Sequence, residues 1–293
     1  MKTLRCRQEF ATLGTVECSE VIDALVTTRM SRKSGRVLEV WEECLRDWNE
    51  TLYRMAAYAM GAPRHSASFE RLTRKVSYLM CLKERSSRFR VEVLLLGASG
   101  LLKSEYFDDG LDLMLNEFGY LGNKYRVEPM QHKDWSVGFG YPAAHPAVRI
   151  VQLAGMVAKD EFGVDGVLGL ATIEDVERVL GVTMSDYWCR RLLPGGVEVG
   201  HIGRDKINML AINLVVPFQM AYARTTNDRE LWNRALNLLE QVPAEHNRLV
   251  GRWTGEGVAC RTAVESQALI EISHMCDEGR CADCPLERVL HRA

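Results

Sequence analysis

The sequence predicts an all-α protein, organised as a multi-helix bundle or array with long irregular connectors. Apolar residues recur at alternating steps of three and four, which places them on one face of a helix. Strict alternation of apolar and polar residues, the pattern of a half-buried strand, is almost absent. The chain has 293 residues, of which 47% are hydrophobic, so it can build one large domain or two ordinary domains around an apolar core.

The helices of the first half follow from this spacing. The clearest apolar stripe, which ends before Gly61, comprises Val37, Trp41, Cys44, Trp48, Leu52, Met55 and Ala59. A second helix begins near Ser68, and the apolar run VEVLLLGASGLL follows it. The next predicted helix carries Leu111, Met114, Leu115, Phe118 and Leu121.

The periodicity stops in the connector VEPMQHKDWSVGFGYPAAHP. Compact domains rarely contain an irregular segment of this length. We therefore predict an N-terminal helical region over residues 1–130 and a C-terminal helical region with a cysteine-rich tail over residues 131–293.

The second half again has helical spacing. Pro146 suits the first turn of a new helix. A strongly apolar helix follows the glycine-rich segment LPGGVEVGHIG and is predicted to bend or end at Pro217. ELWNRALNLLEQV and TAVESQALIEISHM are two more amphipathic helices, and Thr262 with Glu265 forms a predicted capping box before the latter.

The composition argues against a membrane protein, a disulfide-rich protein and a protein that binds polyanions through its overall charge. No window approaches eighteen apolar residues, and the first residues, MKTLRCRQEF, are charged where a signal peptide is apolar, so we expect a cytoplasmic protein without membrane association. Nine cysteines, an odd number, predict reduced thiols rather than a disulfide framework. The net charge of −2 means that binding to a polyanion needs a local basic patch.

One such patch is predicted near the start of the chain. Arg29, Arg32, Lys33 and Arg36 are spaced i, i+3, i+4 and i+7, which places them on one helical stripe. The stripe could neutralise successive phosphates of a nucleic acid or bind an acidic partner protein. The alternative interpretation is an ordinary solvated helix face.

The connector holds the second group of candidate residues. Its polar and aromatic members are His132, Asp134, Trp135, Tyr141, His145 and Arg149. A histidine beside a carboxylate can act as a general base, and the aromatic side chains can stack on a ligand. Alternatively, the aromatic residues anchor an irregular loop to the core. No Walker loop, HExxH motif or G-x-G-x-x-G motif is present, and the glycine-rich segment around Gly195 and Gly196 favours a hinge over an anion-binding loop.

The third group is the tail, where Cys276, Cys281 and Cys284 form the pattern C-x4-C-x2-C. The C-x2-C part allows two thiolates to bind one tetrahedral ion, and zinc is the leading metal. His274 is the predicted fourth ligand, with His291 and Cys260 as alternatives. An iron–sulfur cluster is less favoured: CADCPL is similar to the end of the cluster loop in helix-hairpin-helix DNA glycosylases, but Leu290 stands where that loop needs a cysteine. Free structural thiols remain an open alternative.

Several stretches together resemble one family along nearly the whole chain: RMSRKS, DWNETLYRMAAYAMG, SFERL, VEVLLLGASGLL, NEFGYLGNKYRVEP, AINLVVPFQMAY, RALNLLEQVPAEHN, ESQALIEI and the cysteine pattern. By these residues the chain is similar to the bacterial domain-of-unknown-function family 2851. The resemblance implies no established activity. Longer members are similar to restriction-endonuclease-type nucleases in an N-terminal domain whose GPDF-like and VEIH-like stretches are not found here. Gly138 and Gly140 stand where the family resemblance leads us to expect arginines.

These observations favour a non-catalytic helical accessory or binding protein, associated with nucleic acid or paired with a nuclease-like subunit. The surfaces predicted for this role are the Arg29–Arg36 stripe and the connector with Trp135, Tyr141 and Arg149. One alternative is an enzyme of unknown reaction with its site in the connector over residues 132–149. The other is a structural protein stapled by the metal at the cysteines.

Overall fold

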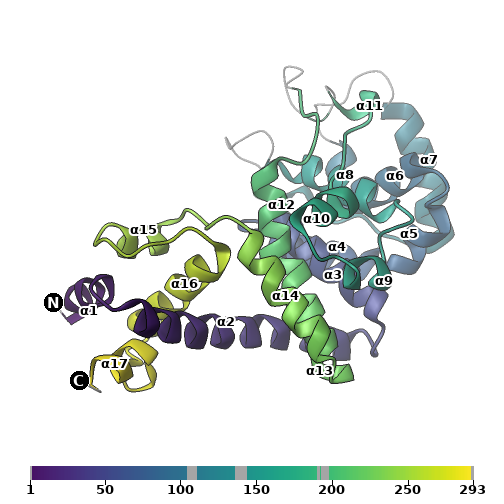
Figure 1. Ribbon diagram of the computed structural model, residues 1–293. Coiled ribbons are helices and arrows are strands. Elements are labelled where there is room, and N and C mark those ends of the chain that lie inside the picture. Colours follow the sequence, from purple (N-terminus) through teal and green to yellow (C-terminus); the bar gives the residue numbers. More distant parts are fainter. Residues whose placement is uncertain (1, 104–110, 136–143, 190–191, 193–197, 292–293) are drawn as a thin grey trace. The chain divides into compact units, whose positions relative to one another are not determined.

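The computed structural model describes residues 2–103, 111–135, 144–189, 192 and 198–291. Every regular element in these ranges is a helix, and backbone pairing of the β type is limited there to isolated bridges such as Thr183 with His201. The predicted all-α array is therefore confirmed (Figure 1). None of the described helices combines the length and the apolar composition that a membrane span requires.

The chain forms two compact units, each assembled from separate stretches of sequence. The first unit comprises Met1–Leu38, Ala171–Ile173 and Val215–Ala293. Its helices are α1 (Lys2–Ala11), most of α2 (Thr15–Glu43), α13 (Val216–Thr226), α14 (Arg229–Gln241), α15 (Arg248–Thr254), α16 (Ala263–Asp277), the 3-10 turn η6 (Cys281–Asp283) and α17 (Pro285–Leu290). α1 contacts α17, so the two terminal helices pack on each other (Figure 1).

The core of the first unit joins α1 and α2 to α15 and α16. Phe10 meets the buried Trp253 edge-on, with 5.8 Å between ring centroids. The Trp253 indole N–H donates to Ser273 Oγ at 2.8 Å, which satisfies the polar atom of this buried side chain. The predicted capping box is also confirmed, because the Thr262 hydroxyl and the Glu265 carboxylate each accept from the other residue's backbone N–H.

The second unit comprises Glu39–Leu170 and Glu174–Leu214. Its helices are α3 (Trp48–Gly61), α4 (Ser66–Lys75), α5 (Tyr78–Glu84), α6 (Arg88–Ala98), α7 (Leu111–Tyr125), α8 (Pro146–Val157), α9 (Val164–Leu168), most of α10 (Ile173–Leu180), α11 (Asp186–Cys189) and α12 (Arg204–Leu210), with short 3-10 turns η1 (Leu101–Lys103) and η2 (His132–Asp134). α6, the predicted apolar run, is buried along most of its length because it packs against both α7 and α8.

The boundary that we predicted near residue 130 lies inside the second unit, and as a division into domains it stays a prediction. The predicted bend at Pro217 takes a specific form. A π-helical turn, Ala211–Val215, separates α12 from α13, and Pro217 lies in the first turn of α13. Proline cannot donate a hydrogen bond to the preceding turn, and the π-helical turn is the helix irregularity that accommodates this loss.

A glycine fixes the turn after α6. Gly100 has φ of +75°, and a Cβ atom built on it would lie 2.0 Å from the main-chain oxygen of Met130. Gly100→Ala is therefore expected to lower the free energy of unfolding by about 2–4 kcal/mol, through backbone strain and overpacking. Gly119→Ala is the matched control, because Gly119 is inside α7 with open space around its Cα; we expect a gain of about 0.5–1 kcal/mol there. Equal changes in the free energy of urea unfolding for the two variants would contradict the conclusion that the turn requires a glycine at position 100.

Candidate functional site

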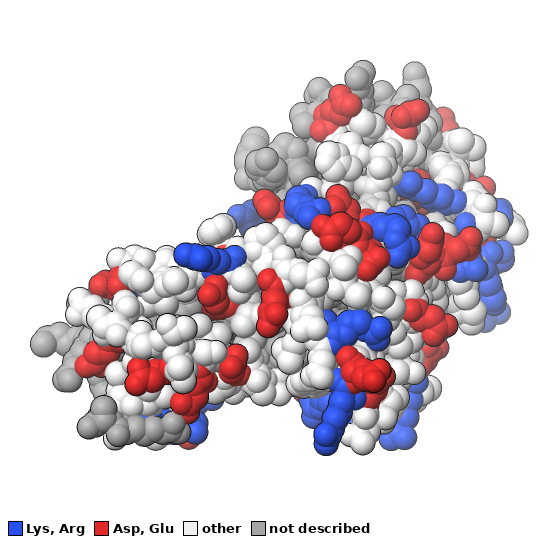
Figure 2. Space-filling view, in the orientation of Figure 1, with Lys and Arg blue, Asp and Glu red and all other residues white. Residues whose placement is uncertain are grey.

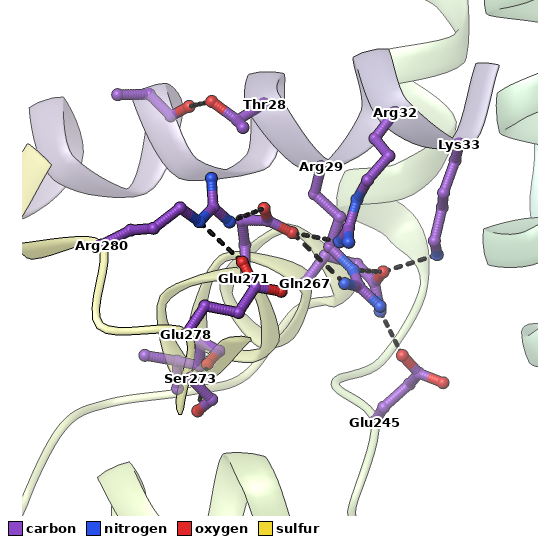
Figure 3. A network of polar contacts seen from close by, with 12 residues as sticks. Thr28, Arg29, Arg32, Lys33, Glu245, Gln267, Glu271, Ser273, Glu278 and Arg280 are labelled. Atoms are coloured by element: carbon purple, nitrogen blue, oxygen red, sulfur yellow. Dashed lines mark hydrogen bonds and ion pairs between the residues drawn. The ribbon is translucent and has the colours of Figure 1, made fainter. Parts of the chain in front are cut away.

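The predicted basic stripe on α2 faces α16 within the first unit (Figure 3). The amide oxygen of Gln267 accepts hydrogen bonds from Arg29 Nε and Lys33 Nζ, each at 2.6 Å. The carboxylate of Glu271 accepts from Arg32 Nη2 at 2.5 Å and lies 3.4 Å from Arg29 Nη1. Arg29 and Lys33 lie one turn apart on α2, and Gln267 and Glu271 lie one turn apart on α16, so the two pairs of side chains face each other.

Burial lowers the pKa values of two cations in this network. The Glu271 side chain is 2% exposed and the Arg29 side chain 13%. Burial, and then the charge of Arg32, lowers the pKa of Arg29. Burial, and then the charge of Arg29, lowers the pKa of Lys33 to about 7. Arg29, Arg32 and Lys33 therefore contact α16 inside the unit. Arg32 nevertheless keeps 53% of its side chain exposed, and Arg36 is also exposed.

The surface charge is mixed where it can be seen. In the described part of the face drawn in Figure 2, Lys and Arg are interspersed with Asp and Glu, and no extended area is basic alone. Proteins that bind nucleic acid through its backbone usually carry a continuous basic area. Partner or nucleic-acid binding by Arg32 and Arg36 stays a prediction.

The connector residues lie in the second unit and do not form one cluster. Tyr141 lies outside the described residues, as do Gly138, Gly140, Gly195 and Gly196. The Asp134 carboxylate accepts from the backbone N–H of Gln131 at 3.0 Å and pairs with Arg71 at 3.4 Å. The predicted pair of His132 with Asp134 is thus replaced, among the described contacts, by a turn cap and an arginine pair.

Trp135 is part of the core. It is 3% exposed, its indole N–H donates to the Ser99 carbonyl at 2.8 Å, and it meets Phe69 edge-on with 5.5 Å between ring centroids. These contacts fix the start of the irregular connector on α4 and on the end of α6. A ring held in this way has no open face for stacking on a ligand.

His145 is the N-cap of α8. Its Nδ1 accepts the backbone N–H of Ala147 at 3.3 Å, which assigns the proton of the neutral ring to Nε2. Burial, followed by the nearby imidazoles of His65 and His132, lowers the pKa of His145. The ring is therefore a neutral donor at physiological pH, next to two further histidines.

Arg149, one turn further along α8, has a different neighbour. Its guanidinium donates to Gln152 Oε1 at 2.9 Å, and burial alone lowers its pKa to about 10. Its charge acts on Lys206 of α12, a lysine that is only 8% exposed. Lys206 Nζ donates to the main-chain oxygens of Ala59 at 2.8 Å and Met60 at 3.0 Å, in the last turn of α3.

No carboxylate among the described residues compensates these two cations. The partners of Arg149 and Lys206 within that part of the chain are an amide and two carbonyls. Burial, and then the charge of Arg149, lowers the pKa of Lys206 to about 7. Gln152 is fully buried, and its Nε2 finds no acceptor in the described structure. A buried lysine and a partly buried arginine without a counter-charge among the described residues, next to an unused donor, make this place a candidate ligand site.

The cysteines of the tail lie around one small cavity of the first unit. Cys276 lies in the last turn of α16, Cys281 begins η6 and Cys284 is the N-cap of α17, and all three line this cavity. Cys6 of α1 lines it as well, whereas the predicted ligand His274 does not. Within the described residues, no three His, Cys, Asp or Glu side chains already stand in an arrangement that would hold a metal ion.

Sequence reasoning missed Lys206, Gln152 and Cys6. Lys206 had a detectable signal, because it precedes Leu210 and Leu214 at the i+4 spacing of an apolar stripe. A lysine on such a stripe must be buried with a partner or extend past the apolar surface to solvent. Gln152 and Cys6 carry no comparable signal.

Comparison with known proteins identifies a family and no characterised relative. A family model described as "Protein of unknown function (DUF2851)" matches residues 1–248, a span that includes α2, α8 and α12 and ends before α16 and the three cysteines of the tail. Neither the curated proteins nor the solved structures contain a match.

Proposed function

The chain belongs to the DUF2851 family of proteins of unknown function, and we propose from its geometry that it is a binding protein whose second unit holds a phosphate group between Arg149 and Lys206. The observation that carries the proposal is that the buried Lys206 and the partly buried Arg149 act on each other while no carboxylate among the described residues pairs with either. Taking two like charges out of water is unfavourable unless an opposite charge joins them. A bound anion would supply that charge.

A phosphate group fits the donors of this site. The planar guanidinium of Arg149 presents several N–H groups, and the described contacts use it for Gln152 alone. Lys206 uses two of its three N–H bonds for the end of α3, which leaves one for a ligand. An anion beside it would also raise the pKa of Lys206 and so complete its protonation near pH 7.

The burial of Lys206 favours a small phosphate or a terminal phosphomonoester over the backbone of a duplex. A duplex is bound by many exposed cations that neutralise successive phosphates. Here one cation is 8% exposed and a second lies beside it. The ligand class is therefore inorganic phosphate or the terminal phosphate of a larger molecule.

Phosphate titration of the full chain tests this proposal. At constant ionic strength and pH 7, we expect sodium phosphate, but not sodium chloride, to raise the midpoint of thermal unfolding, by the equivalent of about 2.7 kcal/mol at one hundred times the dissociation constant. Arg149→Met should abolish this response. Arg204→Ala is the control, because Arg204 is a half-exposed arginine of the same helix as Lys206 that pairs with Glu177 and Glu174. An equal rise of the unfolding midpoint with phosphate in Arg149→Met and in the wild type would contradict the proposal.

The nucleic-acid prediction can be tested with the same protein. Single-stranded oligonucleotides with and without a 5′-phosphate differ only in a terminal phosphomonoester. Binding that requires this group and Arg149 would support association through a nucleic-acid end. Binding of both oligonucleotides, unaffected by Arg149→Met, would instead direct attention to Arg32 and Arg36.

A further inference from the structure

The four cysteines around the cavity of the first unit come from both ends of the chain. Cys276, Cys281 and Cys284 are brought together by a tight turn after α16, in which Gly279 has φ of +72° and the backbone N–H of Arg280 donates to the Met275 carbonyl at 2.9 Å. Glycine adopts this left-handed conformation without a steric cost. Cys6 reaches the same cavity from α1, because α1 packs on α17.

The cavity has the size of a single ion or water molecule. Counted as the space open to the centre of a water-sized sphere, its volume is about 20 Å³, slightly more than one water molecule needs. Ile272, Met275 and Leu286 complete the apolar part of its wall. Arg280 and Glu287 are the remaining residues of the wall.

We propose that Cys6, Cys276, Cys281 and Cys284 bind one zinc ion, with Cys6 as the fourth ligand in place of His274. Four cysteines around one ion are a common structural zinc site, and the C-x2-C spacing of Cys281 and Cys284 is typical of one half of it. The size of the cavity favours one ion over a four-iron cluster. This inference is independent of the phosphate site and goes beyond it.

Binding requires deprotonation and a small movement of the ligands. Four thiols and one Zn²⁺ give a tetrathiolate complex with net charge −2 and release four protons. Burial, and then the neighbouring thiols Cys284, Cys6 and Cys281, raises the pKa of Cys276 to about 11, and burial also raises the pKa of Cys6. The ion reverses this shift in pKa, and rotation about the cysteine side-chain bonds must bring the sulfurs to it.

The consequence for the protein is a link between α1 and α17. Both helices are short, with ten and six residues, and each depends on packing for its stability. A zinc ion bound to Cys6 and to the tail would fix the two ends of the chain to each other. Chelation should then expose both helices to proteolysis before the rest of the first unit.

The test maps the thiols of the wild-type chain with and without zinc. The protein is purified under reducing conditions, loaded with Zn²⁺, and alkylated with iodoacetamide before peptide mass spectrometry, and the metal is counted by elemental analysis. We expect one zinc per chain, with Cys6, Cys276, Cys281 and Cys284 protected at least tenfold by the metal. Cys18 is the internal control, because it is half-buried in the same core and does not line the cavity.

Variants then separate Cys6 from His274. Cys6→Ser should lower the zinc affinity at least tenfold, whereas His274→Ala and Cys18→Ser should retain the wild-type affinity. Loss of zinc in His274→Ala with retention in Cys6→Ser would overturn the assignment of Cys6. No zinc in the loaded wild type, equal protection of Cys18 and Cys6, or a visible iron–sulfur absorption would each overturn the proposed site.

Discussion

Replacing Glu271 with alanine is expected to lower the free energy of unfolding by about 3–5 kcal/mol, because the change leaves the largely buried guanidinium of Arg29 without its ion-pair partner. The carboxylate is 2% exposed and lies against Arg29 and Arg32, with Arg280 at 4.0 Å. Arg29 would keep its hydrogen bond to Gln267 and the weaker influence of the Glu245 carboxylate. Removing one partner of a buried pair is much more costly than the net contribution of the pair itself. Urea unfolding of the full chain, followed by the fluorescence of Trp253 and the other tryptophans, measures the change.

Two variants make this prediction specific. Glu278→Ala removes an exposed carboxylate that also pairs with an arginine, Arg280, at 2.6 Å, and its effect should stay within about 0.5 kcal/mol. Glu271→Gln keeps an acceptor but removes the charge, so its effect should lie between the two. If Glu271→Ala were no more costly than Glu278→Ala, the network would not be what holds α16 on α2.

The helices were predictable because their signals are local. The apolar stripes through α3 and α6 and the capping box of α16 are encoded within one or two turns of sequence. The composition of the two units was not predictable from such signals. Residues 215–293 return to pack with residues 1–38, and no local pattern specifies which amphipathic helices meet.

The same distinction applies to the candidate sites. The stripe of Arg29, Arg32 and Lys33 was correctly placed on one helix face, but its contacts on α16 depend on a helix pairing that the sequence does not reveal. The clustering of Cys276, Cys281 and Cys284 followed from their spacing. Cys6 could not be inferred, because it joins them only after the two ends of the chain have packed together.

Lys206→Met is expected to weaken phosphate binding about 10- to 100-fold, because the phosphate loses one charged hydrogen-bond donor of the protein. The same change should leave the free energy of unfolding unchanged or raise it by up to about 3 kcal/mol. The reason is that the buried ammonium lies beside Arg149 without a carboxylate among the described residues, while a methionine fills similar space without a charge. Isothermal titration with phosphate and urea unfolding without phosphate measure the two effects separately.

Lys159→Met is the matched control. Lys159 also caps the end of a helix in the second unit, donating to the carbonyls of Arg178 at 3.0 Å, Val179 at 3.3 Å and Gly181. Burial lowers the pKa of Lys159, but unlike Lys206 it has a nearby carboxylate, Glu161, which opposes that shift, so its hydrogen bonds should stabilise the fold by about 1 kcal/mol. We expect Lys159→Met to lower stability and to leave phosphate binding intact. If Lys206→Met behaved in the same way, Lys206 would be a helix cap and the site would lose its second cation.

The pH dependence of stability gives an independent measure of the same charge. The pKa of Lys206 is about 7 in the folded chain and 10.5 as its ordinary value, so between these limits the unfolded chain binds more protons than the folded chain. The stability contributed by this group is therefore present above pH 10.5 and lost as the pH falls through about 7. Unfolding should become less favourable between about pH 7 and 8.5, before the cysteines titrate, and the slope should fall in Lys206→Met. Lys33 has the same lowered pKa and supplies the slope that remains. Phosphate should reduce the pH dependence of the free energy of unfolding in the wild type, because a bound anion keeps Lys206 protonated. This result would show that the unfavourable buried charge of Lys206 is compensated by the bound phosphate.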